Sequence, residues 1–242
     1  MNELNGKAEP GWQYDETKLC GVNYNDTWRA WVYDRCQQKF RDYKAESDEI
    51  IAALDMGKNQ TVIDIGCGTG AFTIHAAKYF KKVFAIDISK AMLRRARKKA
   101  GILKLGNIKF CKGGFLTYKH DDEPVDAVVS VKALHHLPDF WKLVGLKRIA
   151  RMIKTGGKLY IKDVVFSFDM DGYESRIKSF IQSMTNRTEP GMKWDLETHF
   201  RQEYSTCGWI MEGLLQRAGF KIETADYKDG FLAAYLCTKD II

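Results

Sequence analysis

The sequence lacks several features that would assign it to a specialised class of protein. No window approaches the roughly 20 uninterrupted apolar residues that a membrane-spanning helix requires. Its start, MNELNGKAEP, lacks the basic and then apolar order of a secretory signal. The six cysteines include no C-x-x-C pair, so neither a disulfide framework nor a zinc finger is indicated. We therefore expect a soluble cytoplasmic protein with no membrane segment and with reduced thiols.

Positive charge, in contrast, is in excess. The formal net charge is +7, and much of it lies in KAMLRRARKKA, residues 90–100. In this stretch Met92, Leu93, Ala96 and Ala100 form an apolar face, and lysines and arginines fill the rest. We interpret the stretch as the solvated outer face of a helix, although a basic surface also leaves RNA open as a partner.

Strand-like and helix-like segments alternate along most of the chain from residue 61 onward. The predicted strands are TVIDI (61–65), KVFAID (82–87), NIKFC (107–111), VDAVVSV (125–131), KLYIKDVVF (158–166), FKIETAD (220–226) and FLAAYLCT (231–238). Such alternation predicts an α/β fold with a doubly wound, mostly parallel seven-stranded sheet. The last two strands are joined by the short turn YKDG, so the last strand is expected to be antiparallel.

Helices are expected between these strands. The predicted helices are AFTIHAAKYF (71–80), a helix capped by Ser89, Phe140–Lys154 ending at Gly156-Gly157, and Ser205–Ala218 ending at Gly219. We treat residues 1–242 as one domain. Its parts are an aromatic-rich N-terminal helical cap (1–58), a cofactor-binding core (59–166), a substrate-recognition insertion (167–204) and a C-terminal helix with a hairpin (205–242).

The stretch TVIDIGCGTG carries the main functional signal. A P-loop is excluded, because no G-K-[ST] follows the glycines. Gly66, Gly68 and Ala71 fit the nicotinamide pattern G-x-G-x-x-G/A, with Asp87 about 20 residues further on. Asp64, however, would be a buried carboxylate that needs a cationic or hydrogen-bonding partner. A ligand with an amino group and a ribose, and without a pyrophosphate, would satisfy both acids.

IDIGCGTG resembles the first motif of the class I S-adenosylmethionine-dependent methyltransferases, and the resemblance is close over about residues 60–165. It implies a Rossmann-like methyltransferase fold, S-adenosyl-L-methionine as methyl donor and S-adenosyl-L-homocysteine as product. It also implies that Gly66, Cys67 and Gly68 pass their backbone beneath the methionine part, with Asp64 in support. The free N–H groups of the following helix would then face the carboxylate of the ligand.

AIDIS resembles the second motif of the same family. The resemblance implies that Asp87 accepts hydrogen bonds from both ribose hydroxyls and that Ile88 packs on the adenine. Met92 either closes the adenine pocket or belongs to the ordinary helix core. After the third strand the family usually carries an acid that contacts the adenine amine, but here Gly114 takes that position. Phe115 can still supply backbone and ring contacts.

SVKALHHLPD resembles the fourth motif of the small-molecule branch of the family. It implies that Lys132 lies near the cofactor and that His135 or His136 lies near the reacting centre. Two adjacent histidines at such a junction can also be structural. Asp163, near the end of a strand, is a candidate general base, with a supporting hydrogen-bonded acid as the alternative.

Residues on the substrate side are predicted from two segments. Tyr24 and Trp28 of the aromatic N-terminal segment are candidates for a lid over cofactor and substrate, since aromatic faces suit a cationic methyl donor. The same rings can instead pack an extra helix onto the sheet. Polar and aromatic candidates in the insertion are Asp169, Asp171, Glu189, Trp194, His199, Arg201 and Tyr204.

The acceptor is predicted from missing motifs. No [DNS]-P-P-[YFW] motif for base amines follows the fourth strand, and no cysteine lies between Cys111 and Cys207 to attack a pyrimidine. A small-molecule acceptor is therefore favoured and nucleic acid is not. Methyl transfer by in-line displacement requires no metal, and we expect none. The alternatives are an RNA methyltransferase and a non-catalytic S-adenosylmethionine-binding protein, with a nicotinamide dehydrogenase last.

Overall fold

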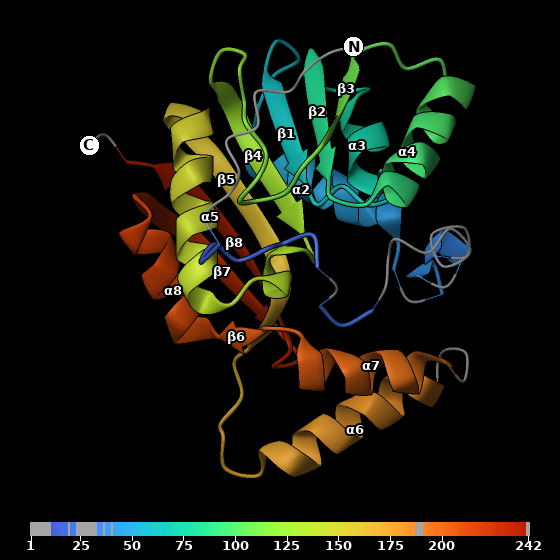
Figure 1. Ribbon diagram of the computed structural model, residues 1–242, viewed down its shortest axis with the longest axis vertical. Helices are drawn as coiled ribbons and strands as arrows, with labels where there is room; N and C mark the ends of the chain where they lie inside the picture. Colours follow the sequence, from blue (N-terminus) through green and yellow to red (C-terminus); the bar gives the residue numbers. More distant parts are fainter. Residues whose placement is uncertain are drawn as a thin grey trace.

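The computed structural model describes residues 11–18, 20–22, 33–35, 37–39, 41–186 and 191–240 (Figure 1). Its strands are β1 (Thr61–Ile65), β2 (Lys82–Asp87), β3 (Ile108–Lys112), β4 (Val125–Val131), β5 (Ile153–Phe166), β6 (Thr206–Cys207), β7 (Phe220–Lys228) and β8 (Leu232–Lys239). The helices are α2 (Tyr43–Leu54), α3 (Ala71–Ala76), α4 (Lys90–Ile102), the short 3-10 helix η1 (Leu134–His136), α5 (Asp139–Met152), α6 (Tyr173–Asn186), α7 (Gly191–Gln202) and α8 (Gly208–Arg217).

A single twisted sheet forms the centre of the molecule, with the strand order β3-β2-β1-β4-β5-β8-β7. Strands β1 to β5 run parallel, and β8 runs antiparallel to both β5 and β7. The predicted seven-stranded sheet with an antiparallel last strand is therefore confirmed. The two-residue strand β6 pairs with the end of β5 and was not predicted.

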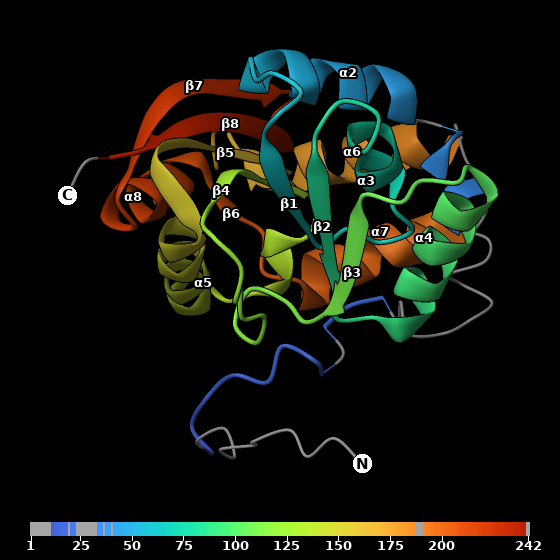
Figure 2. The ribbon, with the colours of Figure 1, turned by 90° about the horizontal axis from the view of Figure 1, so that it is seen from above.

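Helices cover both faces of this sheet (Figure 2). Helices α2 and α3 pack on one face, and α5 and α8 pack on the other. The alternation of side chains along β1 divides its residues between the two cores: Val62 packs under α2 and α3, and Ile63 packs under α5. Asp64 points to the same face as Val62, and its side chain contacts α3.

The insertion forms two helices, α6 and α7, which lie below the sheet in Figure 1, at the end of β5 from which the insertion continues. On α6 the apolar residues recur at helical spacing, but no residue of that helix is fully buried; they are Tyr173, Ile177, Phe180, Ile181 and Met184. None of the helices among the described residues is long and apolar enough to cross a membrane.

Three predicted helix boundaries are wrong. Helix α3 ends at Ala76, four residues before the predicted end. Helix α5 ends at Met152, and Gly156-Gly157 lie inside β5. Both glycines are needed for the pairing of the strands. Gly156 has φ +74°, and the pairing of β4 with β5 shifts register in this region. A Cβ on Gly157 would lie 2.7 Å from the carbonyl oxygen of Asp126. A glycine pair that admits a bulge and a close approach looks the same in sequence as a helix terminator.

The last helix begins three residues later than predicted, at Gly208, because Thr206 and Cys207 pair with β5 as a strand. Other local predictions are confirmed. Ser89 caps α4 by accepting a hydrogen bond from the N–H of Met92 at 3.2 Å, and Gly219 follows α8 with φ +92°.

Candidate functional site

The turn between β1 and α3 is built from three glycines with left-handed backbone. Gly66, Gly68 and Gly70 have φ of +76°, +54° and +81°, a region that costs side-chain-bearing residues energy. A Cβ on Gly66 would lie 2.3 Å from the Cβ of Ala133, so the turn touches the segment after β4. A Cβ on Gly68 would meet nothing within 4 Å. The turn is therefore tightly packed at its first glycine and open at its second.

Asp64 places a carboxylate beneath this turn. Its side chain is 2% exposed, and the hydroxyl of Thr73 donates a hydrogen bond to it. Burial, together with the charge of nearby Asp87, raises the pKa of Asp64 to about 7. In the unliganded protein, burial of this charged carboxylate opposes folding. An ammonium group or another cation in the cavity would offset that free-energy penalty.

Asp87, at the end of β2, joins the turn to the start of α4. One carboxylate oxygen accepts the N–H of Gly68 at 2.8 Å, and the other accepts the N–H of Ser89 at 2.7 Å. Burial raises the pKa of Asp87 to about 6. Each oxygen keeps a second lone pair, so the carboxylate is oriented to accept two hydroxyl groups of a ligand.

A cavity of about 700 Å³ opens above these groups. All nine residues predicted to bind the cofactor line it: Asp64, Gly66, Cys67, Gly68, Asp87, Ile88, Met92, Phe115 and Lys132. Their contacts with a cofactor stay predictions. Met92 also packs against Ala91 and Tyr33, so its two expected roles, helix core and pocket wall, are compatible. Tyr24 and Trp28 lie outside the described residues.

Lys132 and Arg41 add positive charge to the cavity wall. Lys132 has φ +53°, and its N–H donates to the carbonyl oxygen of Lys162 at 2.7 Å. Burial, together with the charge of Arg41, lowers the pKa of Lys132 to about 8. Arg41 pairs with Glu46 of α2. The N-terminal cap therefore contributes charged groups to the site.

Glu16 is a second contribution of the N-terminal cap that the sequence did not reveal. It is 7% exposed, and one of its oxygens accepts the N–H groups of Leu116 and Thr117 at 3.0 and 2.7 Å. A Cβ on Gly114 would lie 2.5 Å from its other oxygen. The carboxylate of Glu16 thus occupies the space into which an acidic side chain at position 114 would project.

His135, on η1, lines the same cavity. Its backbone N–H donates to Asp163 at 3.0 Å, and its Nδ1 forms a hydrogen bond with the other oxygen of the same carboxylate. Asp163 is 1% exposed and lies behind the ring, where its Oδ1 also accepts the N–H of Val164. Burial would raise the pKa of Asp163, but the charge of His135, its hydrogen bond and the N–H of Val164 together lower it. The two predicted catalytic residues are therefore in contact with each other.

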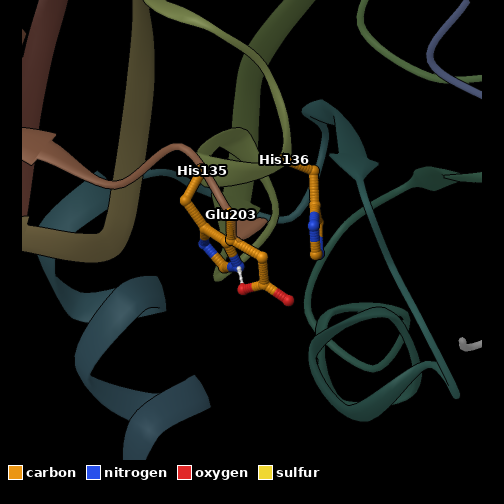
Figure 3. Close-up of side chains that lie close together, drawn as sticks. All are labelled: His135, His136 and Glu203. Carbon is orange, nitrogen blue, oxygen red and sulfur yellow. Dashed lines mark ion pairs between the residues drawn. The ribbon is translucent and has the colours of Figure 1, made fainter. Parts of the chain in front are cut away.

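Glu203 completes a cluster around His135 (Figure 3). Its carboxylate lies 3.3 Å from Nε2 of His135 and also contacts Nδ1 of His199. Burial alone would lower the pKa of His135, but the carboxylates of Asp163 and Glu203 on its two ring nitrogens raise it to about 9. Burial would raise the pKa of Glu203, but hydrogen bonds from the two histidines hold it well below its usual range.

His136 lies beside this cluster, with its ring centroid 4.4 Å from that of His135. Burial, and then the charge of His135, lower the pKa of His136 to about 4. Its ring is therefore neutral at pH 7. The two adjacent histidines differ in charge because only His135 is held between carboxylates.

The insertion supplies an apolar wall to the same cavity. This wall consists of Phe180, Met184, Met192, Leu196 and Phe200, together with Phe231, which directly precedes β8. Phe180 and Phe231 stack at 4.2 Å between ring centroids, and Phe166 and Phe200 stack at 5.9 Å. The cavity thus has a polar half at the glycine turn and an apolar half at the insertion.

Of the insertion residues predicted to face substrate, only His199 lines the cavity. Glu189 lies outside the described residues, and the other five do not line it: Asp169, Asp171, Trp194, Arg201 and Tyr204. Glu203 was missed. The only signal available in the sequence was its spacing of four from His199, which places both on one face at the end of a helix.

Comparisons with known proteins agree with this geometry. A family model described as a methyltransferase domain matches residues 62–157. The uncharacterized methyltransferase GK2543 of Geobacillus kaustophilus is 27% identical over 211 residues, which cover 85% of this chain and 92% of that protein. A solved S-adenosylmethionine-dependent methyltransferase from Aquifex aeolicus has a TM-score of 0.63 and 18% identity, and covers 88% of this chain and 98% of its own. The magnesium protoporphyrin IX methyltransferase of Synechocystis, solved with bound S-adenosylhomocysteine, has a TM-score of 0.62 at 16% identity, over 89% and 98% of the two chains.

The chain is a methyltransferase with a Rossmann-like methyltransferase fold. The solved structures are below 25% identical and show the shared fold. The residues of the cavity fit S-adenosylmethionine as the methyl donor. The open side of Gly68, the buried acid of Asp64 and the oriented oxygens of Asp87 supply room, negative charge and hydroxyl acceptors.

Two alanine substitutions separate packing in the turn from cofactor binding. Both Gly66→Ala and Gly68→Ala place alanine in left-handed backbone, which costs about 1–2 kcal/mol. We expect Gly66→Ala to destabilise the unliganded methyltransferase further, because its Cβ meets Ala133. Gly68→Ala should cost less stability but weaken S-adenosylhomocysteine binding, because its methyl group enters the open side of the turn. Urea unfolding measures the loss of stability, and calorimetry measures the affinity for S-adenosylhomocysteine. Equal destabilisation by both variants would contradict the close contact between Gly66 and Ala133.

Asp64→Asn should stabilise the unliganded protein while weakening cofactor binding. The folded-state pKa of about 7 lies above the usual value of 3.8 for an aspartate, so ionising Asp64 at pH 8 opposes folding. Removing that charge should add on the order of 1–4 kcal/mol at pH 8, and less at pH 5, where the folded wild type holds a proton. Urea unfolding at the two pH values tests the sign. An equal or absent gain at both would show that Asp64 is not strained.

Proposed function

We propose that this methyltransferase transfers a methyl group to a small-molecule acceptor bound in the apolar half of the cavity. The observation that carries the proposal is the apolar wall formed by the insertion: Phe180 and Phe200 line the same cavity as the glycine turn. A volume of about 700 Å³ suits a cofactor and a modest organic acceptor. The apolar wall favours an acceptor with a hydrophobic body.

The polar groups at the cluster around His135 would hold the nucleophilic end of that acceptor. When bound, S-adenosylmethionine supplies a methyl group on a positively charged sulfonium. Asp163 positions His135, whose raised pKa keeps it charged at neutral pH. We therefore propose that His135 acts indirectly, by holding the carboxylate of Glu203 in position. The carboxylate of Glu203 and the neutral ring of His136 are the groups that face the acceptor's hydroxyl, thiol or amine.

The RNA alternative draws less support from the structure. Of the cations on the basic helix α4, Lys99 and Arg95 pair with Asp34 at 2.5 and 3.9 Å. The remaining cations form a solvated face, as the sequence indicated. RNA binding that is tight and falls steeply with salt would favour this alternative. The alternative of a non-catalytic S-adenosylmethionine-binding protein is distinguished from an enzyme only by measuring methyl transfer.

The acceptor half can be tested with one substitution and a matched control. Phe200→Ala removes an aromatic side chain from the apolar wall, and Trp209→Ala removes one that is 76% exposed on α8. Candidate acceptors are first screened by release of S-adenosylhomocysteine from S-adenosylmethionine. For an acceptor so found, Phe200→Ala should raise KM about tenfold or more, because roughly 2 kcal/mol of apolar burial is lost. Cofactor affinity should not change.

Trp209→Ala should leave both constants unaltered. An unchanged KM in Phe200→Ala would remove the insertion from the acceptor site. Methylation of RNA, with no small molecule accepted, would overturn the proposed substrate class.

Glu16 also has a proposed role, as the acceptor of the adenine amine in place of the acid missing at position 114. One of its oxygens lies beside Gly114, and Glu16, Gly114 and Phe115 line the same cavity as Asp87 and Ile88. Glu16→Ala should weaken S-adenosylhomocysteine binding by about tenfold or more, since a hydrogen bond to a charged group is lost. The deaminated analogue S-inosylhomocysteine, which lacks the amine, should lose much less. Equal weakening of the two ligands in calorimetry would mean that Glu16 only supports the loop through Leu116 and Thr117.

A further inference from the structure

Two histidines and one glutamate converge at the wall of the cavity. Ligating atoms of His135, His136 and Glu203 lie within 4.8 Å of one another. In the view of Figure 3 the carboxylate of Glu203 lies between the two imidazole rings. The histidines come from η1, and the glutamate follows α7, so folding brings together groups that are almost 70 residues apart in sequence.

Outer partners orient two of these three groups. Asp163 accepts a hydrogen bond from Nδ1 of His135, which directs Nε2 toward Glu203. His199 contacts the carboxylate of Glu203 through Nδ1, and its other nitrogen bonds the hydroxyl of Ser205 at 2.8 Å. A carboxylate behind a histidine and a hydrogen bond behind a carboxylate are the supports that metal ligands have in proteins.

The donor set indicates a class of ion. Two imidazole nitrogens and one carboxylate oxygen suit zinc and neighbouring transition metals, whereas magnesium and calcium prefer oxygen ligands. All three residues line the cavity, so the fourth coordination position would face the acceptor half. Three protein ligands with one open position are typical of catalytic zinc sites.

We propose that His135, His136 and Glu203 bind one divalent transition-metal ion, and that the nucleophilic atom of the acceptor occupies its open position. The second part rests on the proposed function. Metal binding displaces the proton that Nε2 of His135 otherwise directs to Glu203. The location suits the reaction: the segment that carries both histidines begins at Ala133, which touches the glycine turn at Gly66. The proposal departs from the sequence-based expectation that no metal is involved.

The ion would supply an activated nucleophile. Coordination makes a hydroxyl or thiol more acidic, so the acceptor's proton leaves to solvent before transfer. The lone pair of the oxygen or sulfur then forms the bond to the methyl carbon. The bond between that carbon and the sulfonium sulfur breaks, and its electron pair stays on sulfur to give the neutral thioether S-adenosylhomocysteine. No oxidant or reductant is needed.

Metal binding by the full chain tests the site without requiring activity. The protein is stripped with a chelator and titrated with Zn²⁺, Co²⁺ and Mg²⁺ by calorimetry, with the visible absorption of Co²⁺ as a ligand signature. We expect one Zn²⁺ or Co²⁺ per chain and no comparable binding of Mg²⁺. His136→Ala and Glu203→Gln should each weaken binding at least tenfold. Asp163→Asn, which acts through His135, should weaken it by about 10- to 100-fold.

The control is His120→Ala, because His120 bonds Tyr118 and the carbonyl oxygen of Glu123 away from the cluster. Its metal affinity should equal that of the wild type. Urea unfolding and S-adenosylhomocysteine affinity establish that each variant is folded. The site is overturned if the stripped wild type binds no stoichiometric Zn²⁺ or Co²⁺, or if folded His136→Ala and Glu203→Gln bind it as well as the wild type.

Failure of the metal site and failure of the proposed function are distinguishable. If the stripped protein methylates a small acceptor at the full rate, and chelator does not slow it, the proposed function stands and the metal's role is overturned. If metal binds as expected but only RNA is methylated, the metal site is confirmed and the proposed small-molecule acceptor is overturned.

Discussion

Burial of two carboxylates at the ends of adjacent parallel strands is the constraint on which the rest of the site depends. Asp64 and Asp87 are nearly inaccessible, and burial raises the pKa of each toward neutrality. Such groups oppose folding unless hydrogen bonds or a ligand compensate them. Thr73, and the backbone N–H groups of Gly68 and Ser89, supply part of that compensation. The remainder is available to a ligand with a positive charge and hydroxyl groups, as the cofactor has.

The same turn connects the cofactor site to the chemistry next to it. Gly66 has no room for a side chain because Ala133 lies against it, and Ala133 leads directly into the two histidines. The strands β1 and β4, which carry the two segments, are hydrogen-bonded neighbours. A rigid sheet therefore sets the spacing between cofactor and histidine cluster, while the insertion and the N-terminal cap supply the variable parts around them.

The core was predictable because its signals are local. Alternating buried strands, a glycine turn and an acid at each of two strand ends are readable from short stretches, and the structure places all nine predicted cofactor residues on one cavity. The groups missed are those that long-range packing brings in. Glu16 reaches position 114 from the N-terminal cap, and Glu203 reaches His135 from beyond α7. The prediction that a helix ends at Gly156-Gly157 was wrong, because glycine is favoured both where a helix stops and where a strand bulges.

A crystal structure of the chain with S-adenosylhomocysteine tests the central claim most directly, because it locates both ends of the cofactor at once. The account predicts that the ribose hydroxyls bond the carboxylate of Asp87 and that the sulfur faces the cluster of His135, His136 and Glu203 across the acceptor half of the cavity. A sulfur directed away from that cluster, or a ribose that does not contact Asp87, would contradict it.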